Sequence, residues 1–280
     1  MSATTDPDLP AWSLTREAIC AVPLPSAWPE PLSRGWAWGD SRGEGVRVAV
    51  IDSGIDAGHP RLGGAVRRAV HVGRAADGRL AVTEDDAGDV SGHGTACAGI
   101  IHSVAPACEL TSVRVLGAGL TGEGDALLAG LRWAVQERHD VVNLSLSTTK
   151  ASFLGALHEL ADAAYFGSCA LVASAHNMPV DSYPWRFSSV LSVASHSGTD
   201  PLQYFYNPQP PVEFHARGLD VEVAWAGGSV IRASGNSFAA PHVAGIAALV
   251  LAHHPGLTPF QLKSVLHLAA SNVATSEPGR

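Results

Sequence analysis

The stretch GNSFAAPHVAG at residues 235–245 leads directly into the apolar run IAALVLA, and together they predict a buried helix. Ser237 stands at the start of this helix, with Pro241 one turn further on. A serine at this place is open to two interpretations. It can be an ordinary N-cap, which serine favours and near which proline is tolerated. It can also be a nucleophile, because free N–H groups and the positive end of the helix dipole can hold an oxyanion beside it.

Around this helix, apolar strands alternate with helical segments, which predicts a mainly parallel sheet. We expect strands at residues 46–51, 110–116, 141–146, 170–173, 190–194 and 219–224, and helices at 94–102, 125–137, 152–165, 238–253 and 259–269. The predicted fold class is therefore α/β, with three layers: a mainly parallel central sheet and helices on both of its faces. Residues 1–44 are rich in Pro and Trp, and we predict that they form an N-terminal arm packed on a domain of residues 45–280.

The bulk composition excludes several classes of protein. The chain has 280 residues, of which 46% are hydrophobic, enough for one sizeable domain. A net charge of −8 without a Lys/Arg cluster argues against nucleic acid or an anionic membrane as a partner. No apolar run reaches the ~20 residues of a membrane span, and the first ten residues lack the features of a signal peptide, so we expect a cytoplasmic protein with reduced cysteines. The sequence does not fix the oligomeric state, and we expect a monomer.

Two further stretches carry polar residues at the ends of predicted elements. VAVIDSGID at 48–56 places Asp52 at the end of a strand, and SGHGTACAG at 91–99 places His93 between two glycines at the start of a helix. Taken singly, such an aspartate is usually a turn former and such a histidine is usually structural. Together with Ser237 they supply an acid, a base and a nucleophile. A serine hydroxyl needs a base within hydrogen-bond reach, and the base needs a third group that fixes its tautomer.

The order of these residues along the chain restricts the class of hydrolase. A strand–elbow–helix hydrolase requires Ser, then an acidic residue, then His, but no histidine follows Glu277, the only acidic residue after Ser237. A trypsin-like serine motif is suggested at residues 39–41, but no histidine precedes it, since His59 is the first. The order Asp, His, Ser remains.

The three stretches give the chain a resemblance to the subtilisin-like serine proteases. The resemblance extends over residues 36–271 and is densest in V-A-V-I-D-S-G-I-D, G-H-G-T-x-C-A-G and G-x-S-x-A-x-P-H-V-A-G. It implies a serine endopeptidase in which Ser237 attacks the peptide carbonyl, His93 relays the proton and Asp52 orients the imidazole. Asn177, at the end of LVASAHN, is implied as an oxyanion donor beside the Ser237 N–H. No cofactor and no metal ion is expected.

The resemblance also implies where a substrate lies. The family binds peptides as an added strand along two segments, and the partner expected here is a peptide or protein. The matching residues are Leu120, Thr121, Gly122, Ser145, Leu146 and Ser147.

The chain departs from the family pattern around the predicted specificity pocket. Ser147 and Thr148 replace two glycines, which predicts a narrower wall, and His176 replaces the glycine before Asn177. Asp181 and Ser182 fall near the expected pocket floor, where an acidic group would suit a basic side chain at the cleaved position. The loop that carries the family's tight calcium site is missing from residues 98–106.

Other polar residues near these motifs or in partial motifs are not expected to be catalytic. Cys97 lies one helical turn beyond His93, and we expect a packed thiol beneath the imidazole that makes the enzyme sensitive to thiol reagents, as in relatives with a cysteine there, without taking part in catalysis. His158 and Glu159 begin a near match to the zinc motif HExxH that lacks its second histidine. The pair His253–His254 is explained by its place at a helix end.

The function predicted from these observations is that of a serine endopeptidase, dedicated to processing a leader peptide or a partner protein inside the cell. The alternative is a catalytically silent subtilisin-like module that only binds. Because His93 must be neutral to act as a base, activity is expected to fall as the pH drops through about 6–7.

Overall fold

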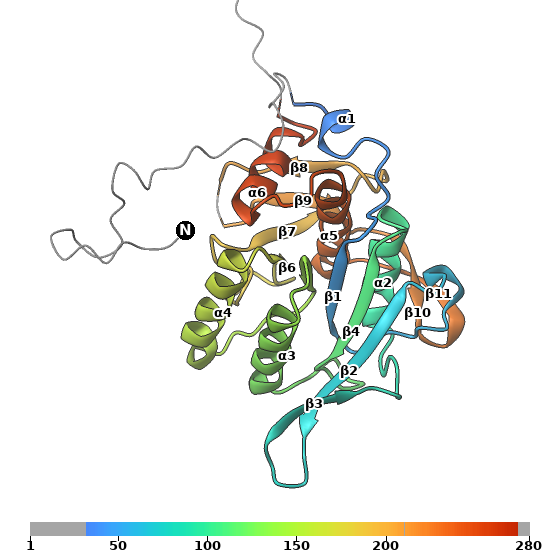
Figure 1. Ribbon diagram of the computed structural model, residues 1–280, viewed down its shortest axis with the longest axis vertical. Coiled ribbons are helices and arrows are strands. Elements are labelled where there is room, and N and C mark those ends of the chain that lie inside the picture. The colour runs from blue at the N-terminus through green and yellow to red at the C-terminus, as the bar shows by residue number, and fades with distance from the viewer. Residues whose placement is uncertain (1–31, 210, 274–280) are drawn as a thin grey trace, which may run out of the picture.

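A nine-stranded sheet forms the middle layer of the molecule (Figure 1). The computed structural model describes residues 32–209 and 211–273. The strands of this sheet are β1 (Arg47–Asp52), β2 (Val66–Arg74), β3 (Leu80–Glu84), β4 (Glu109–Arg114), β5 (Val141–Leu144), β6 (Ala170–Ser174), β7 (Leu191–His196), β8 (Tyr204–Tyr206) and β9 (Phe214–Arg217). Their order is β3-β2-β4-β1-β5-β6-β7-β9-β8. All pairings from β2 to β9 are parallel, and only the edge strands β3 and β8 pair antiparallel.

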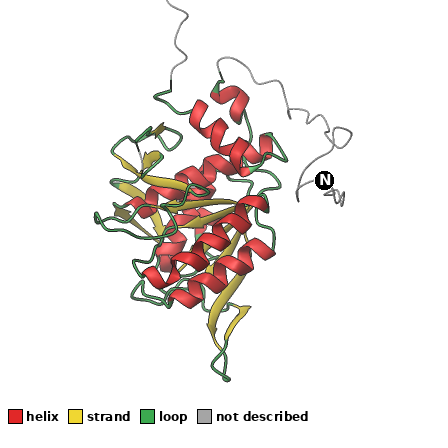
Figure 2. Cartoon of the chain, turned by 90° about the vertical axis from the view of Figure 1, so that its left-hand side faces the viewer, coloured by secondary structure: helices red, strands yellow, loops and turns green. Residues whose placement is uncertain are grey.

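Helices cover both faces of the sheet, as Figure 2 shows, so the predicted three-layer α/β fold is confirmed. The helices are α1 (Arg34–Ala37), α2 (His93–Val104), α3 (Gly124–Gln136), α4 (Leu154–Phe166), α5 (Asn236–His253) and α6 (Pro259–Leu268). The apolar residues of the central strand β1 contribute to two hydrophobic cores, one on each face of the sheet. Val48 and Val50 pack with α2 and α5 on one face, whereas Ala49 and Ile51 pack with α3 and α4 on the other. Alternate side chains of a strand point to opposite faces, so a strand covered twice must be apolar at every position.

Helix α5 lies in the core, and all its residues from Phe238 to Val250 are buried. A helix that is apolar on every side is stable only when it is surrounded by protein. The helix begins at Asn236, two residues earlier than the sequence indicated, so Pro241 lies beyond its first turn. Because α5 is buried from its third residue as far as Val250, the start of the helix is packed against the sheet.

The sequence did not predict the hairpin of β2 and β3, nor β8 and β9. Strand β2 carries three arginines and a histidine among its nine residues, and these polar residues obscure the apolar pattern of the strand in the sequence. The strand expected at 219–224 exists as β10 (Val221–Trp225), but it is not part of the main sheet. It pairs antiparallel with β11 (Ser229–Ala233) in a separate two-stranded sheet that packs against α2. Alternation along a single strand indicates a half-buried strand but does not identify its partner.

Part of the predicted arm is described by the structure. Helix α1 begins after Ser33, whose hydroxyl accepts a hydrogen bond from the Trp36 N–H, and the following Trp38 is buried in the same core as α5. Residues 1–31, including Trp12 and Trp28, lie outside the described residues. Among the residues that are described, no helix is both long and apolar enough to serve as a transmembrane span.

Candidate active site

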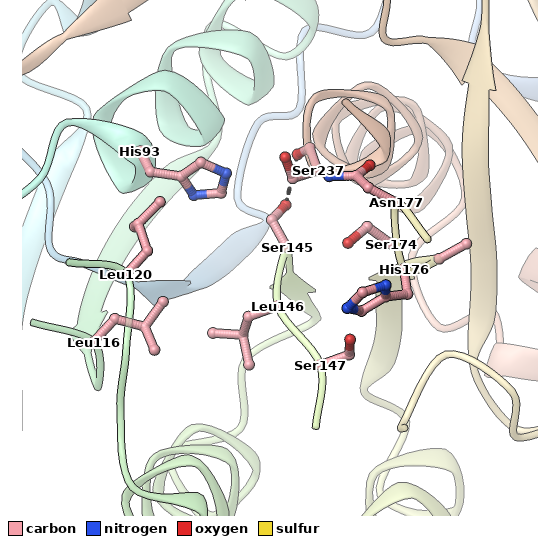
Figure 3. Close-up of a pocket in the computed structure, with 11 residues that line it drawn as sticks. His93, Leu116, Leu120, Ser145, Leu146, Ser147, Ser174, His176, Asn177 and Ser237 are labelled. Atoms are coloured by element: carbon pink, nitrogen blue, oxygen red, sulfur yellow. Dashed lines mark hydrogen bonds between the residues drawn. The ribbon is translucent and has the colours of Figure 1, made fainter. Parts of the chain in front are cut away.

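A cavity of about 260 Å³ opens at the carboxyl edge of the sheet, beside the start of α5 (Figure 3). Its lining residues come from five separate parts of the chain: His93, Leu116, Leu120, Ser145, Leu146, Ser147, Ser174, Ala175, His176, Asn177 and Ser237. The carboxyl ends of strands are where functional sites of parallel α/β sheets gather. The cavity contains the predicted base, nucleophile and oxyanion donor together.

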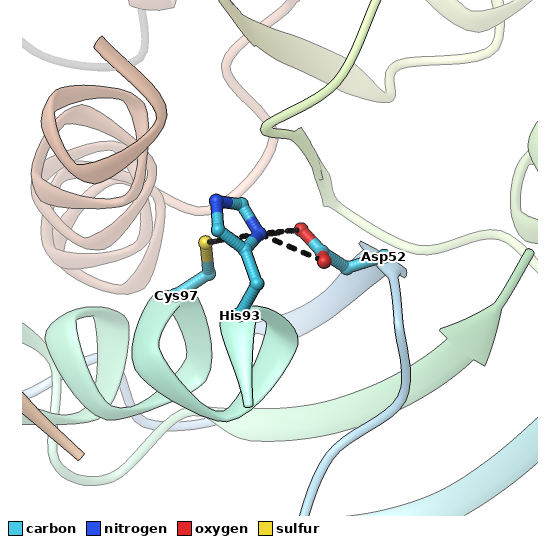
Figure 4. Close-up of side chains that lie close together, drawn as sticks. All are labelled: Asp52, His93 and Cys97. Atoms are coloured by element: carbon cyan, nitrogen blue, oxygen red, sulfur yellow. Dashed lines mark hydrogen bonds and ion pairs between the residues drawn. The ribbon is translucent and has the colours of Figure 1, made fainter. Parts of the chain in front are cut away.

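Asp52 and His93 are in direct contact (Figure 4). The Nδ1 atom of His93 lies 2.9 Å from both carboxylate oxygens of Asp52, and the Asp52 side chain is fully buried. The backbone N–H of Ser53 donates a further hydrogen bond to Asp52 Oδ1. A carboxylate on Nδ1 fixes the imidazole tautomer with its lone pair on Nε2, which is the form that can accept a proton from a hydroxyl.

The two glycines beside His93 allow close packing around the start of α2. Gly92 has φ of 106°, a left-handed conformation that favours glycine, and a side chain there would also collide with the ring of Trp225. A Cβ on Gly94 would lie 2.0 Å from the carbonyl oxygen of Gly54, in the turn that follows Asp52. Both glycines thus let the start of α2 approach the end of β1.

Burial and the neighbouring carboxylate act on the pKa of His93 in opposite directions. Burial alone would lower the pKa of the imidazole, because a charged ring loses solvation. The adjacent Asp52 carboxylate outweighs this effect and raises the pKa of His93 above its ordinary value of 6.5. Burial raises the pKa of the neighbouring Cys97 thiol, which therefore stays neutral and adds no negative charge at physiological pH.

Ser237 is the second residue of α5 and does not cap it. The N-cap is Gly235, and no side chain makes a capping hydrogen bond there. The interpretation of Ser237 as an N-cap is therefore wrong. Its backbone N–H is one of the four at a helix start that have no acceptor within the helix. This N–H is available to an oxyanion at the site.

Pro241 accounts for a contact that ties Ser237 to the opposite side of the cavity. In a regular helix the N–H of residue 241 would bond to the carbonyl of residue 237, but proline has no N–H. The carbonyl oxygen of Ser237 instead accepts a hydrogen bond of 2.8 Å from the Ser145 hydroxyl. Asn143 Nδ2 donates to the same hydroxyl at 3.1 Å. The free carbonyl that Pro241 leaves therefore links the helix of Ser237 to the predicted substrate segment.

Asn177 lies beside Ser237 in a defined orientation. Its Oδ1 accepts a hydrogen bond of 2.9 Å from the Asn236 N–H. Gly235 lies between the two side chains: a Cβ built on it would be 3.3 Å from Ser237 Oγ and 3.5 Å from Asn177 Nδ2. The Asn177 amide and the Ser237 hydroxyl thus border the same small volume beside Gly235.

Ser237 and His93 line one cavity, but no hydrogen bond joins the hydroxyl to the imidazole in the described part of the chain. Catalytic hydrogen bonds are often long without substrate and shorten in the complex.

Asp89 is a residue of the site that sequence reasoning missed. Its carboxylate accepts hydrogen bonds from the N–H groups of Ser91, Gly92 and Thr95 and from the hydroxyls of Ser53 and Thr95. It thereby ties the turn after β1 to the start of α2. A carboxylate is favoured at a helix N-terminus, and an acidic residue four positions before His93 was the available signal.

Cys97 is packed beneath the Asp52–His93 pair. The fully buried Sγ lies 3.9 Å from Asp52 Oδ2, 4.0 Å from His93 Nδ1 and 3.6 Å from the Ser237 carbonyl oxygen. One ligand atom from each of the three side chains lies within 4.8 Å of the others, so this group could hold a metal ion. The thiol would lose its proton on binding such an ion, and a set of one sulfur, one nitrogen and one oxygen ligand suits thiophilic or zinc-like ions. Such an ion would occupy the imidazole nitrogen of His93 that Asp52 contacts.

The predicted substrate segments border two neighbouring cavities. Leu120, Ser145, Leu146 and Ser147 line the cavity that contains Ser237. Thr121 and Gly122 line a second cavity of about 260 Å³, which shares Leu120, Leu146 and Ser147 with the first.

Two other predictions concerned the pocket floor and the calcium loop. Asp181 and Ser182 do not line the cavity: Asp181 is ion-paired with Arg186, and buried Ser182 accepts a hydrogen bond from the Trp185 indole. Asp181 is therefore not positioned to bind a basic substrate side chain in this cavity, and the expected preference for a basic residue at the cleaved position loses its support. Helix α2 runs from His93 to Val104 without interruption.

The other histidines singled out in the sequence lie in ordinary surroundings. His158 lies on α4, 3.5 Å from Asp162 one turn further along the helix. His254 Nε2 lies 2.7 Å from the carbonyl oxygen of Trp36.

The fold and the site together define a parallel-sheet protein with an Asp–His pair beside a serine at a helix start. Comparison with known proteins identifies the family: residues 43–279 match the subtilase family, and the chain belongs to it. Over 241 residues the chain is 32% identical to a thermostable alkaline protease of Halalkalibacterium halodurans, covering 82% of this chain and 63% of that protein. It is 30% identical to subtilisin DY of Bacillus licheniformis, with coverage of 84% and 87%. A solved structure of a cold adapted subtilisin-like serine proteinase is similar, with a TM-score of 0.66, 29% identity and coverage of 84% and 87%.

Proposed function

We propose that this protein is a serine endopeptidase with Asp52, His93 and Ser237 as its catalytic residues. The observation that carries the proposal is the 2.9 Å contact between Asp52 and His93 at the wall of a cavity that Ser237 and Asn177 also line. The named relatives are proteases, and the chain spans 63% of the length of the alkaline protease among them.

The proposed reaction proceeds through an acyl-enzyme. Ser237 Oγ attacks the carbonyl carbon of the scissile bond while His93 Nε2 takes the hydroxyl proton, and Asp52 stabilises the resulting imidazolium. The Ser237 N–H and Asn177 Nδ2 hold the oxygen that becomes negative. His93 then gives its proton to the leaving amine, and a water molecule, activated by the same imidazole, hydrolyses the acyl-enzyme.

A fluorophosphonate probe tests this proposal against the alternative of a silent binding module. The probe is expected to label the wild-type protein and the variant Ser264→Ala, a serine of α6, but not Ser237→Ala. Absence of labelling in folded wild-type protein would favour the binding module.

We further propose that the enzyme processes a restricted set of peptides. The support is the cavity wall, which includes Ser147 and His176, at positions where the family resemblance implies glycine. Digestion of a diverse peptide library, with products sequenced by mass spectrometry, tests this: cleavage after many unrelated side chains would contradict a dedicated role. The cytoplasmic location and the monomeric state stay predictions of the sequence.

A further inference from the structure

The cavity beside Ser237 extends between residues 145–147 and residues 174–177, as Figure 3 shows. Under the proposed function, on which this inference rests, the side chain that precedes the scissile bond enters this space. Ser145 and Asn177 in these segments are already hydrogen-bonded to the start of α5. Three further polar side chains of the two segments line the space: Ser147, Ser174 and His176. The chemistry of these three groups therefore indicates which side chain is accepted.

The protonation of His176 follows from its local contacts. Its Nδ1 lies 3.0 Å from the backbone nitrogen of Met178, whose N–H is directed at it, and 3.2 Å from the Met178 carbonyl oxygen. An amide N–H can only donate, so Nδ1 accepts, and the neutral ring carries its proton on Nε2. Figure 3 shows the ring directed into the cavity, toward Ser147. The site thus presents an N–H donor that makes no hydrogen bond to any described residue.

The two serines add hydroxyls that can donate or accept. Neither the Ser147 hydroxyl nor the Ser174 hydroxyl forms a hydrogen bond within the described residues, and Ser174 is only 5% exposed. Both hydroxyls are therefore available to a ligand that enters the cavity. Among the residues that the structure describes, no Asp, Glu, Lys or Arg lines the cavity.

We propose that this pocket selects a carboxamide side chain, glutamine or asparagine, on the amino side of the scissile bond. The amide oxygen accepts from His176 Nε2, and the amide NH₂ donates to the serine hydroxyls. A carboxylate would be buried without a cation, and a lysine would be buried without a carboxylate. A large apolar side chain would leave the three polar groups unpaired.

Peptides that differ only in the residue before the scissile bond test the proposal. With Gln, Asn, Glu, Leu and Lys at that position, the wild-type kcat/KM is expected to be highest for Gln or Asn. His176→Phe keeps a ring of similar size but removes the donor, so the ratio of kcat/KM for Gln over Leu should fall about 2- to 10-fold, the usual effect of one hydrogen bond. His158→Phe, an exposed histidine of α4, should leave this ratio unchanged. Ser147→Ala removes one hydroxyl without adding bulk and should also lower the ratio.

Labelling of Ser237 by the fluorophosphonate probe distinguishes failure of the carboxamide assignment from failure of the proposed endopeptidase function. If wild type and variants are labelled but Leu, Lys or Glu is preferred, or if His176→Phe and Ser147→Ala leave the Gln-to-Leu ratio unchanged, the carboxamide assignment is overturned and the endopeptidase stands. If folded wild-type protein is not labelled, the proposed function fails and the inference fails with it.

Discussion

The side-chain oxygen of Asn177 accepts a hydrogen bond of 2.9 Å from the backbone N–H of Asn236, at the first residue of the helix that carries Ser237. This contact fixes which way the Asn177 amide faces, because its oxygen is committed to the helix. The NH₂ group is then directed at the space beside the Ser237 hydroxyl. Under the proposed mechanism, the same helix start supplies one oxyanion donor from its own backbone and orients the second.

Replacing Asn177 by leucine removes the donor but keeps a side chain of similar size. Because the donor is needed only when the oxyanion forms, kcat should fall about 10²- to 10³-fold, a magnitude known from the equivalent change in a subtilisin, with little change in KM. Steady-state kinetics on a peptide substrate measure this. A tenfold rise in KM with unchanged kcat would instead make Asn177 a substrate-binding residue.

Gly235 offers a second test of the same space. Its backbone is extended, so alanine is not strained there, but a Cβ would lie 3.3 Å from Ser237 Oγ and 3.5 Å from Asn177 Nδ2. Gly235→Ala should therefore lower kcat without lowering Tm. The control is Gly155→Ala in α4, where an added Cβ meets no atom within 4 Å and activity should be unchanged.

The elements that are covered on both faces were predictable from sequence, because their apolar runs are continuous. The motifs around Asp52, His93 and Ser237 placed those residues at the ends of such elements, where the structure also has them. Contacts that depend on the tertiary fold were not predictable. The Ser145 hydroxyl donates a hydrogen bond to the Ser237 carbonyl, which belongs to a segment distant in the sequence. Strand β10 pairs with β11 outside the main sheet. The local sequence pattern predicts neither contact.

The raised pKa of His93 makes a prediction about pH. A general base works only when neutral, so activity should be lost as the pH falls through a value above the ordinary imidazole pKa of 6.5. In Asp52→Asn the carboxylate no longer stabilises the imidazolium, so the acid limb of kcat/KM should move to lower pH and kcat should fall about 10⁴-fold. Profiles of both proteins from pH 5 to 9 check this, and an acid limb at the same pH in both would contradict the role of Asp52.

We expect Cys97 to make the enzyme sensitive to thiol reagents without being required for peptidase activity. Cys97→Ser keeps a small polar atom under His93, and peptidase activity is expected to remain within about tenfold of wild type, because Ser237 is the nucleophile. Mercuric ions, which would bind between Sγ and His93 Nδ1, should inhibit the wild type and not this variant. Cys169→Ala, another buried cysteine, should retain the inhibition. Loss of all activity in folded Cys97→Ser would show that the thiol takes part in catalysis.

The ion pair of Arg114 and Asp85 ties the end of β4 to the turn after β3, and it should contribute to stability. Arg114 donates two hydrogen bonds of 2.8 Å to Asp85, whose side chain is 2% exposed. Burial raises the pKa of this carboxyl, but the guanidinium outweighs burial and holds the pKa below its usual value. Arg114→Met leaves a buried carboxylate without its cation and should lower the free energy of unfolding by about 3 kcal/mol at pH 7.

The pair of Arg232 and Asp220 provides the matched comparison. It has the same two-pronged geometry, but its side chains are 59% and 71% exposed, so Arg232→Met should cause no measurable change in urea unfolding. Because the pKa of Asp85 is lowered in the folded protein, the pair's contribution is present above the ordinary carboxyl pKa of about 4 and is lost as the pH falls through the lower folded value. The difference between wild type and Arg114→Met should therefore shrink in acid. A difference that is constant between pH 7 and pH 3 would mean that the arginine acts through packing and not through its charge.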